Sequence, residues 1–144
     1  MALFLSSMAP STATSFAGLE HQVHFSKNSN QISSEEIRSL VEWEIKTVQF
    51  GGVDYGVFAY RDDRLQIDLK LAERRRDAIV LLMNTLGIQI KDTGIENLNA
   101  PYIGRKLSQE EASTVFVTVQ PPCIRTRSCL PVPISASKPQ ELNK

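Results

Sequence analysis

Apolar residues recur with the period of a helix or a strand only between residues 33 and 119. Before this stretch, residues 1–32 are rich in Ser and Thr, with Glu20 and Lys27 as their single acid and single Lys or Arg. After it, residues 120–144 hold five of the seven prolines, which remove backbone donors and favour extended conformations. The 144 residues therefore predict one domain over 33–119, between a disordered leader and a Pro-rich disordered tail.

The clearest element within the domain is a helix over residues 72–86. Ile79, Met83 and Leu86 fall on one stripe when successive residues are spaced by 100°. Gly87 follows, and glycine readily adopts the left-handed conformation that ends many helices. We expect the stripe to face the core.

Alternation of apolar and polar residues indicates strands on both sides of this helix. Residues 53–60 (VDYGVFAY) and 65–71 (LQIDLKL) flank the polar turn RDDR, which predicts a hairpin. Residues 88–92 (IQIKD) and 114–119 (TVFVTV) predict two further strands.

The start of the domain is ambiguous. Ser33 followed by Glu36 is a capping-box pattern that begins a helix, and Ser108 begins a second, smaller one. Residues 41–50 keep helical spacing, but VEWEIKT also alternates without a fault. The β-branched content favours a short helix followed by a strand.

Together these elements predict an α+β domain. We expect a small antiparallel sheet, a three-stranded meander plus one or two further strands, packed by the single main helix 72–86. The predicted core residues share strand or helix periodicity and point to one interior: Leu65, Ile67, Leu69, Ile79, Met83, Leu86, Val115 and Val117.

The sequence offers few candidate catalytic residues. The two histidines, His21 and His24, lie in the predicted leader, and no glycine-rich phosphate loop occurs. Asp62 and Asp63 are bracketed by arginines, which favours a turn with local ion pairs over an acid–base pair or a cation site. We therefore expect no enzyme, no cofactor and no bound metal.

The two cysteines, Cys123 and Cys129, are too few for a zinc site, which needs about four ligands. A disulfide between them would close only a small loop, so we interpret them as incidental thiols in a reducing compartment. No apolar run reaches the roughly 20 residues that span a bilayer, so no membrane span is expected.

Basic residues gather around the start of the main helix. The candidate binding residues are Lys70, Arg74, Arg75, Arg76, Arg61 and Arg64. On the helical wheel Arg75 and Arg76 border the apolar stripe, so we expect them to be partly buried and paired with carboxylates, with Arg74 free. The alternative is a phosphate grip, because the element order resembles that of the double-stranded-RNA-binding domain, whose last helix sends basic residues onto phosphates.

Binding is thus the expected function. The favoured hypothesis is a non-catalytic interaction or assembly module with a protein partner. One alternative is an RNA-binding module that uses the basic first turn of the 72–86 helix or the basic tail. Another is a small accessory regulatory protein of viral type.

The leader also carries a prediction of localisation. Its first 19 residues are uncharged, and the whole stretch is serine-rich and poor in acids, which is typical of an organelle transit peptide. The absence of arginine favours the plastid, and the cytoplasm is the alternative.

Overall fold

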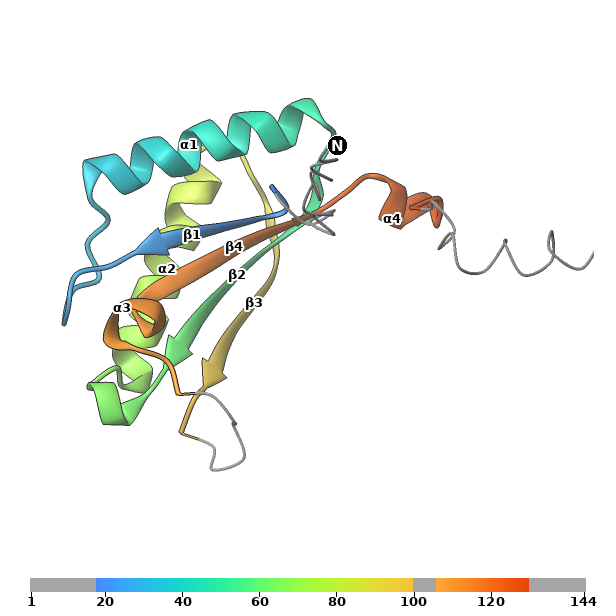
Figure 1. Ribbon diagram of the computed structural model, residues 1–144. Coiled ribbons are helices and arrows are strands. Elements are labelled where there is room, and N and C mark those ends of the chain that lie inside the picture. The colour runs from blue at the N-terminus through green and yellow to red at the C-terminus, as the bar shows by residue number, and fades with distance from the viewer. Residues whose placement is uncertain (1–17, 100–105, 130–144) are drawn as a thin grey trace, which may run out of the picture.

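A computed structural model describes residues 18–99 and 106–129, which form a mixed α/β fold with a four-stranded sheet (Figure 1). The elements follow the order β1 (Glu20–His24), α1 (Ser34–Gln49), β2 (Val53–Arg61), the 3-10 turn η1 (Asp63–Leu65), α2 (Leu69–Thr85), β3 (Ile90–Asn97), α3 (Gln109–Ala112), β4 (Thr114–Gln120) and α4 (Cys123–Thr126). The predicted three-stranded antiparallel meander with one main helix is therefore only partly correct, because two long helices and a mixed sheet are present.

The strand order is β1-β4-β2-β3, and β4 pairs antiparallel with both β1 and β2. The β2–β3 pair is parallel, with Val57 opposite Thr93 and Ala59 opposite Ile95. Parallel neighbours need a long crossover, which α2 supplies. Consequently β1, β2 and β3 all run the same way, and their carboxyl ends meet at one edge of the sheet.

The core lies between the sheet and the helices, and Figure 1 shows α2 crossing behind the strands. Alternate residues of the strands, such as Val57, Val115 and Val117, are fully buried against Ile79 and Met83 of α2. Four of the eight predicted core residues belong to this set (Ile79, Met83, Val115 and Val117). Ile67 is also buried, Leu65 and Leu86 are partly buried, and Leu69 is 41% exposed.

Residues 34–49 form one continuous helix, so the predicted strand over residues 41–50 is wrong. Ser33 caps the helix by accepting a hydrogen bond from the Glu36 amide, as the sequence predicts. The alternating apolar residues do not share an environment, because Trp43 is buried whereas Ile45 is 49% exposed. Trp43 Nε1 donates to the Gly18 carbonyl at 2.9 Å, which ties the helix to the start of β1.

The predicted strand over residues 65–71 is also wrong, and with it the hairpin. Asp62 caps the short turn η1, and Asp68 caps α2 by accepting from the Leu71 amide at 2.8 Å. These two caps start a turn and a helix where the alternation predicts a strand. The main helix therefore begins at Leu69, three residues earlier than predicted, while Gly87 beyond its end has the expected positive φ of 83°.

The other two predicted strands are present. The strand predicted over 114–119 is confirmed as β4, and Ser108 forms the predicted capping box ahead of it. The strand predicted over 88–92 is β3, but it starts at Ile90 and continues beyond the predicted end to Asn97. Its polar residues reflect its place at the edge of the sheet, beside β2 alone.

Part of the predicted leader belongs to the fold. Residues 20–24 form β1, which pairs with β4, and Val23 is fully buried. His21 packs against Trp43 with ring centroids 5.6 Å apart. Because β1 has five residues and one core residue, its apolar periodicity is too weak to predict a strand within this polar stretch. Residues 1–17, the remainder of the predicted disordered leader, lie outside the described residues.

The first part of the predicted tail also contacts the domain, through an ion pair with β2. Cys123 and Cys129 form a disulfide with their Cα atoms 4.7 Å apart, so the interpretation as incidental thiols is wrong. Between them, Arg125 Nη2 lies 3.0 Å from Asp54 Oδ1 at the start of β2, and Lys91 Nζ lies 3.6 Å from the other oxygen of Asp54. Residues 130–144 lie outside the described residues.

We expect Ile79→Ala to lower the free energy of unfolding by about 2–5 kcal/mol, because it opens a cavity under the sheet. Leu81→Ala is the matched control, since Leu81 lies on the same helix and is 69% exposed. It should change stability by less than about 0.5 kcal/mol in urea denaturation. Equal effects of the two substitutions would contradict the assigned face of α2.

The Arg125 guanidinium, through its hydrogen bond to Asp54, holds the pKa of that carboxyl below its ordinary value. Because the folded pKa is depressed, the stabilisation is complete above the pKa of the unfolded chain and is lost as pH falls through the folded value. We expect Arg125→Gln to raise the pKa of Asp54 in an NMR titration of its carboxyl carbon, whereas Arg127→Gln should leave it unchanged. An unaltered pKa in Arg125→Gln would show that the contact does not form in solution.

Candidate functional site

The carboxyl ends of β1, β2 and β3 bring several connecting segments to one edge of the sheet, which we call the carboxyl edge. Residues 25–29 follow β1, the η1 turn follows β2, and residues 98–99 follow β3. The short helix α3 lies there too, because β4 starts at this edge. In open α/β sheets, ligands bind outside the carboxyl ends of the strands.

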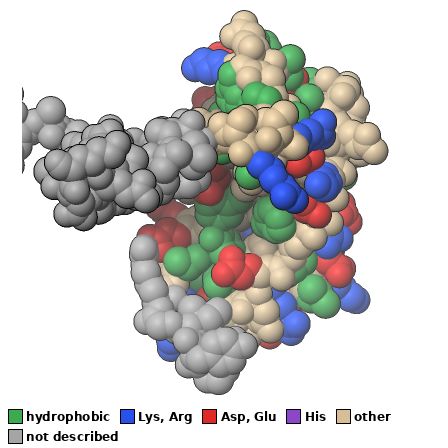
Figure 2. Space-filling model, turned by 90° about the vertical axis from the view of Figure 1, so that its right-hand side faces the viewer, with side chains coloured by type: hydrophobic (Ala, Val, Ile, Leu, Met, Phe, Trp, Pro, Cys, Tyr) green, Lys and Arg blue, Asp and Glu red, His purple; other side chains and the backbone are tan. Residues whose placement is uncertain are grey.

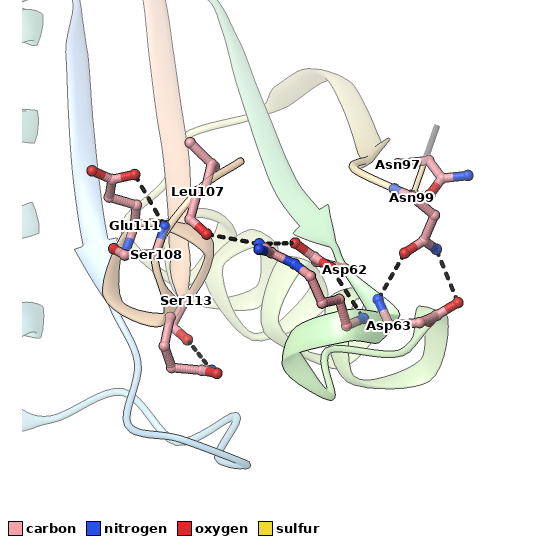
Figure 3. Close-up of polar contacts among 10 residues, drawn as sticks. Asp62, Asp63, Asn97, Asn99, Leu107, Ser108, Glu111 and Ser113 are labelled. Carbon is pink, nitrogen blue, oxygen red and sulfur yellow. Dashed lines mark hydrogen bonds and ion pairs between the residues drawn. The ribbon is translucent and has the colours of Figure 1, made fainter. Parts of the chain in front are cut away.

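A buried carboxylate organises the middle of the carboxyl edge. Asp62 is 3% exposed and accepts hydrogen bonds from the Arg64 amide and from Arg64 Nη2, both at 3.1 Å. The same Nη2 atom donates to the Leu107 carbonyl at 2.8 Å. Figure 3 shows this chain of contacts, which ties the turn after β2 to the segment leading into α3.

A second set of contacts joins the η1 turn to the end of β3. The Asp63 amide donates to Asn99 Oδ1 at 2.8 Å, and Asn99 Nδ2 donates back to Asp63 Oδ2 at 2.9 Å (Figure 3). Arg61 Nη2 lies 3.1 Å from the same oxygen of Asp63. The predicted turn with local ion pairs is thus confirmed, as Arg61 pairs with Asp63 and Arg64 with Asp62.

The side chain of Arg75 is the most unusual group near this edge, because it is only 2% exposed. Its Nε donates to the Ser29 carbonyl at 2.8 Å and its Nη2 donates to the Ser26 carbonyl at 3.0 Å. The guanidinium carbon lies 5.4 Å from the centre of the Phe25 ring, within the range of a cation–π contact. Arg75 therefore fastens the loop after β1 to α2.

The remaining nitrogen of Arg75, Nη1, is buried and has no hydrogen-bond partner. Burial lowers the pKa of the guanidinium, but arginine stays charged in proteins. The prediction that Arg75 pairs with a carboxylate is wrong, since both acceptors are backbone carbonyls. A buried cation with one unused donor is suited to receive an anionic group, and a carboxylate matches the planar guanidinium.

The other predicted binding residues do not converge on one ligand. Arg76 Nε pairs with Asp77 at 2.9 Å, as the predicted carboxylate contact requires. Arg74 and Lys70 are exposed and have no hydrogen bond or ion pair within residues 18–99 and 106–129, which agrees with a free Arg74. Figure 2 shows Lys and Arg side chains interspersed with Asp and Glu on the face it presents, not gathered into a basic patch.

Sequence reasoning missed Ser26, Ser29 and Phe25, which surround Arg75. The two serines contribute backbone carbonyl oxygens. Because every residue has such an oxygen, the residue type gives no indication of this role. The only available signal is the position of Arg75 at the margin of the apolar stripe, which predicts its burial but not its partners.

Within the described part of the chain, no group of three or more His, Cys, Asp and Glu side chains is placed to hold a metal ion. The helices described there also include none with the length and apolar character to cross a membrane.

No protein-family model matches the chain, and no sequence among the curated proteins does. Solved structures do match. The cell wall anchor of the T6SS from Pseudomonas aeruginosa is 18% identical, with a TM-score of 0.52 over 71% of this chain and 80% of that chain. This likeness shows a shared mixed α/β fold.

Two further structures match at lower TM-scores. The OmpA-like domain of FopA1 from Francisella tularensis is 15% identical, with a TM-score of 0.46 over 71% of this chain and 74% of that chain. The periplasmic domain of Helicobacter pylori MotB is 11% identical, with a TM-score of 0.47 over 75% of this chain and 86% of that chain.

The first of these matches corrects the predicted localisation. The plastid prediction is wrong, because the structure that shares this fold at a TM-score of 0.52 is a cell wall anchor from a bacterium. The transit-peptide interpretation rested on serine content and low acidity, which describe a composition and carry no structural signature. The fold shared with the cell wall anchor gives no support to the RNA-binding alternative either.

We expect Arg75→Ala to lower the free energy of unfolding by about 2–4 kcal/mol, because it removes the two donors to the Ser26 and Ser29 carbonyls and leaves Phe25 uncovered. Arg74→Ala, one position away on α2, should change it by less than about 0.5 kcal/mol. Urea denaturation of the two variants measures the difference. A stable Arg75→Ala variant would show that the loop after β1 is held by other contacts.

Proposed function

We propose that this protein is a non-catalytic binding domain of the bacterial envelope that attaches to the cell wall. One support is the fold, which is shared with a protein described as a cell wall anchor. The observation that carries the proposal is the buried Arg75 side chain, whose Nη1 atom lacks a partner. Its ligand is a carboxylate of the wall polymer.

The geometry of Arg75 favours a fixed role in recognition. Two of its nitrogens are held by the carbonyls of Ser26 and Ser29, so the orientation of the third is set before any ligand arrives. A preorganised donor loses little conformational entropy on binding. Charge-assisted hydrogen bonds from arginine to a carboxylate are also among the stronger polar contacts in proteins.

Binding at Nη1 needs a local opening, because this atom is covered in the free protein. The carboxyl edge is built from connecting segments, and such segments move more readily than the strands they join. Asp62 lies in the same group of segments, but it forms its ion pair with Arg64. It therefore does not compete with a ligand carboxylate for Arg75.

The disulfide between Cys123 and Cys129 supports an envelope location as well. Disulfides persist in oxidising compartments such as the bacterial periplasm and are rare in the cytosol.

Co-sedimentation of the purified chain with insoluble bacterial cell wall sacculi tests the proposal. We expect the unaltered chain to pellet with the sacculi. Arg75→Lys keeps the charge but loses the fork of donors, and we expect about tenfold weaker binding, the loss of one charge-assisted hydrogen bond. Arg74→Lys is the control and should bind as the unaltered chain does.

Circular dichroism of each variant must show a folded chain, so that lost binding is not mistaken for lost structure. If the unaltered chain stays in the supernatant, cell wall attachment is refuted. If folded Arg75→Lys pellets as well as Arg74→Lys, Arg75 does not hold the wall ligand.

A further inference from the structure

One face of the sheet carries neither of the two long helices. The contacts of α1 with β1 and of α2 with β2, β3 and β4 fall on the opposite face, which holds the core (Figure 1). We call the side that neither long helix covers the open face. Its central residues are Phe58 and Phe116, which lie opposite each other in the β2–β4 register, with Tyr60 beside them.

These aromatic residues form a connected surface. The Tyr60 and Phe116 rings meet edge to face, with centroids 5.2 Å apart. The Phe58 ring lies over Gly56 and Gly94, where an added Cβ would come within 2.7 and 3.1 Å of ring atoms. The two glycines therefore let Phe58 lie close to the sheet, and all three rings remain only partly buried.

Two adjoining hollows border this surface near α3. One, of about 390 Å³, is lined by Tyr60, Phe116, Gln22 and Leu107. The other, of about 430 Å³, is lined by Gln22, His24, Phe25 and Glu110. Both are open to solvent in the described residues, so long side chains of a partner have room beside the rings.

The charge of the open face has one sign. Glu20 and Glu96 lie on the edge strands β1 and β3 and point to the same side as Phe116 and Tyr60, and Asp92 lies opposite Gly56. The alternate residues of the four strands that form this face include no Lys or Arg. Burial raises the pKa of Tyr60, and the nearby Glu96 and Glu20 raise it further.

We propose that the open face docks a protein segment rich in arginine or lysine. Cations are attracted to the faces of aromatic rings, and carboxylates on both sides of the rings would hold the same charges. A neutral glycan would gain no charge attraction from these carboxylates, and an anionic polymer would be repelled. The three rings and three carboxylates of the open face do not include Arg75, whose neighbour Phe25 lines only an adjoining hollow, so the docking proposal does not depend on cell wall attachment.

Fluorescence anisotropy with a fluorescein-labelled peptide of alternating Arg and Gly tests this, with a peptide that has Gln in place of Arg as the neutral probe. We expect the folded full chain to bind the Arg peptide and not the Gln peptide. The triple variant Glu20→Gln, Asp92→Asn, Glu96→Gln should weaken binding about tenfold or more. The control triple on α1, Glu35→Gln, Glu42→Gln, Glu44→Gln, removes equal charge and should stay within about twofold.

A pair of variants at two phenylalanines distinguishes docking on the rings from general electrostatic attraction. Phe116→Leu keeps the charge and the apolar character of the open face but removes a ring, and it should weaken the Arg peptide about fivefold. Phe50→Leu, at an exposed site after α1, should have no effect. Equal weakening by the two triple variants, unchanged binding by folded Phe116→Leu, or equal binding of the neutral peptide would each overturn the proposal.

Discussion

The whole sheet depends on β4, the last strand among the described residues, which is inserted between β1 and β2. Its residues Val115, Val117 and Val119 are all buried, and it supplies both partners with an antiparallel ladder. Without β4 the five residues of β1 have no neighbour, and β2 has only the parallel partner β3. Contacts between residues about 100 positions apart must therefore form before the core is complete, which raises the entropic cost of closing the fold.

The segments gathered at the carboxyl edge are each held by a different kind of contact. Arg75 fastens the loop after β1, Asp62 and Arg64 fasten the turn after β2, and Asn99 fastens the end of β3. Among these groups only Arg75 keeps a buried side-chain donor without a partner in the described residues. Since unpaired buried polar atoms are rare in folded proteins, such an atom is more informative about binding than the satisfied ion pairs beside it.

Much of the local structure could be predicted from the sequence, because local rules govern it. The helix ending before Gly87, the strand β4, the caps at Ser33 and Ser108 and the ion pairs around Asp62 all depend on residues within a few positions of one another. The strand predicted over 65–71 failed because its alternation was overridden by the caps Asp62 and Asp68. The alternation of apolar and polar residues does not by itself indicate where a capping residue starts a new turn or helix.

The long-range features could not be predicted in the same way. The parallel pairing of β2 with β3 is decided by the crossover through α2, and β1 is a strand only because β4 lies beside it. The partners of Arg75 are backbone carbonyls, which carry no sequence signature. The candidate site was therefore predicted only as a group of basic residues, of which one proved to be buried.

The position of β3 at the edge of the sheet has a consequence for how the protein behaves at high concentration. An edge strand presents unpaired backbone donors and acceptors, to which a strand of another molecule can add. The strand β3 carries Lys91, Asp92 and Glu96, and charged side chains along an edge oppose such additions because they would have to be brought together and desolvated. The opposite edge, β1, is only five residues long and offers little ladder to extend. The same polar residues that made β3 hard to predict as a strand thus help to keep separate copies of the chain from joining into a continuous sheet.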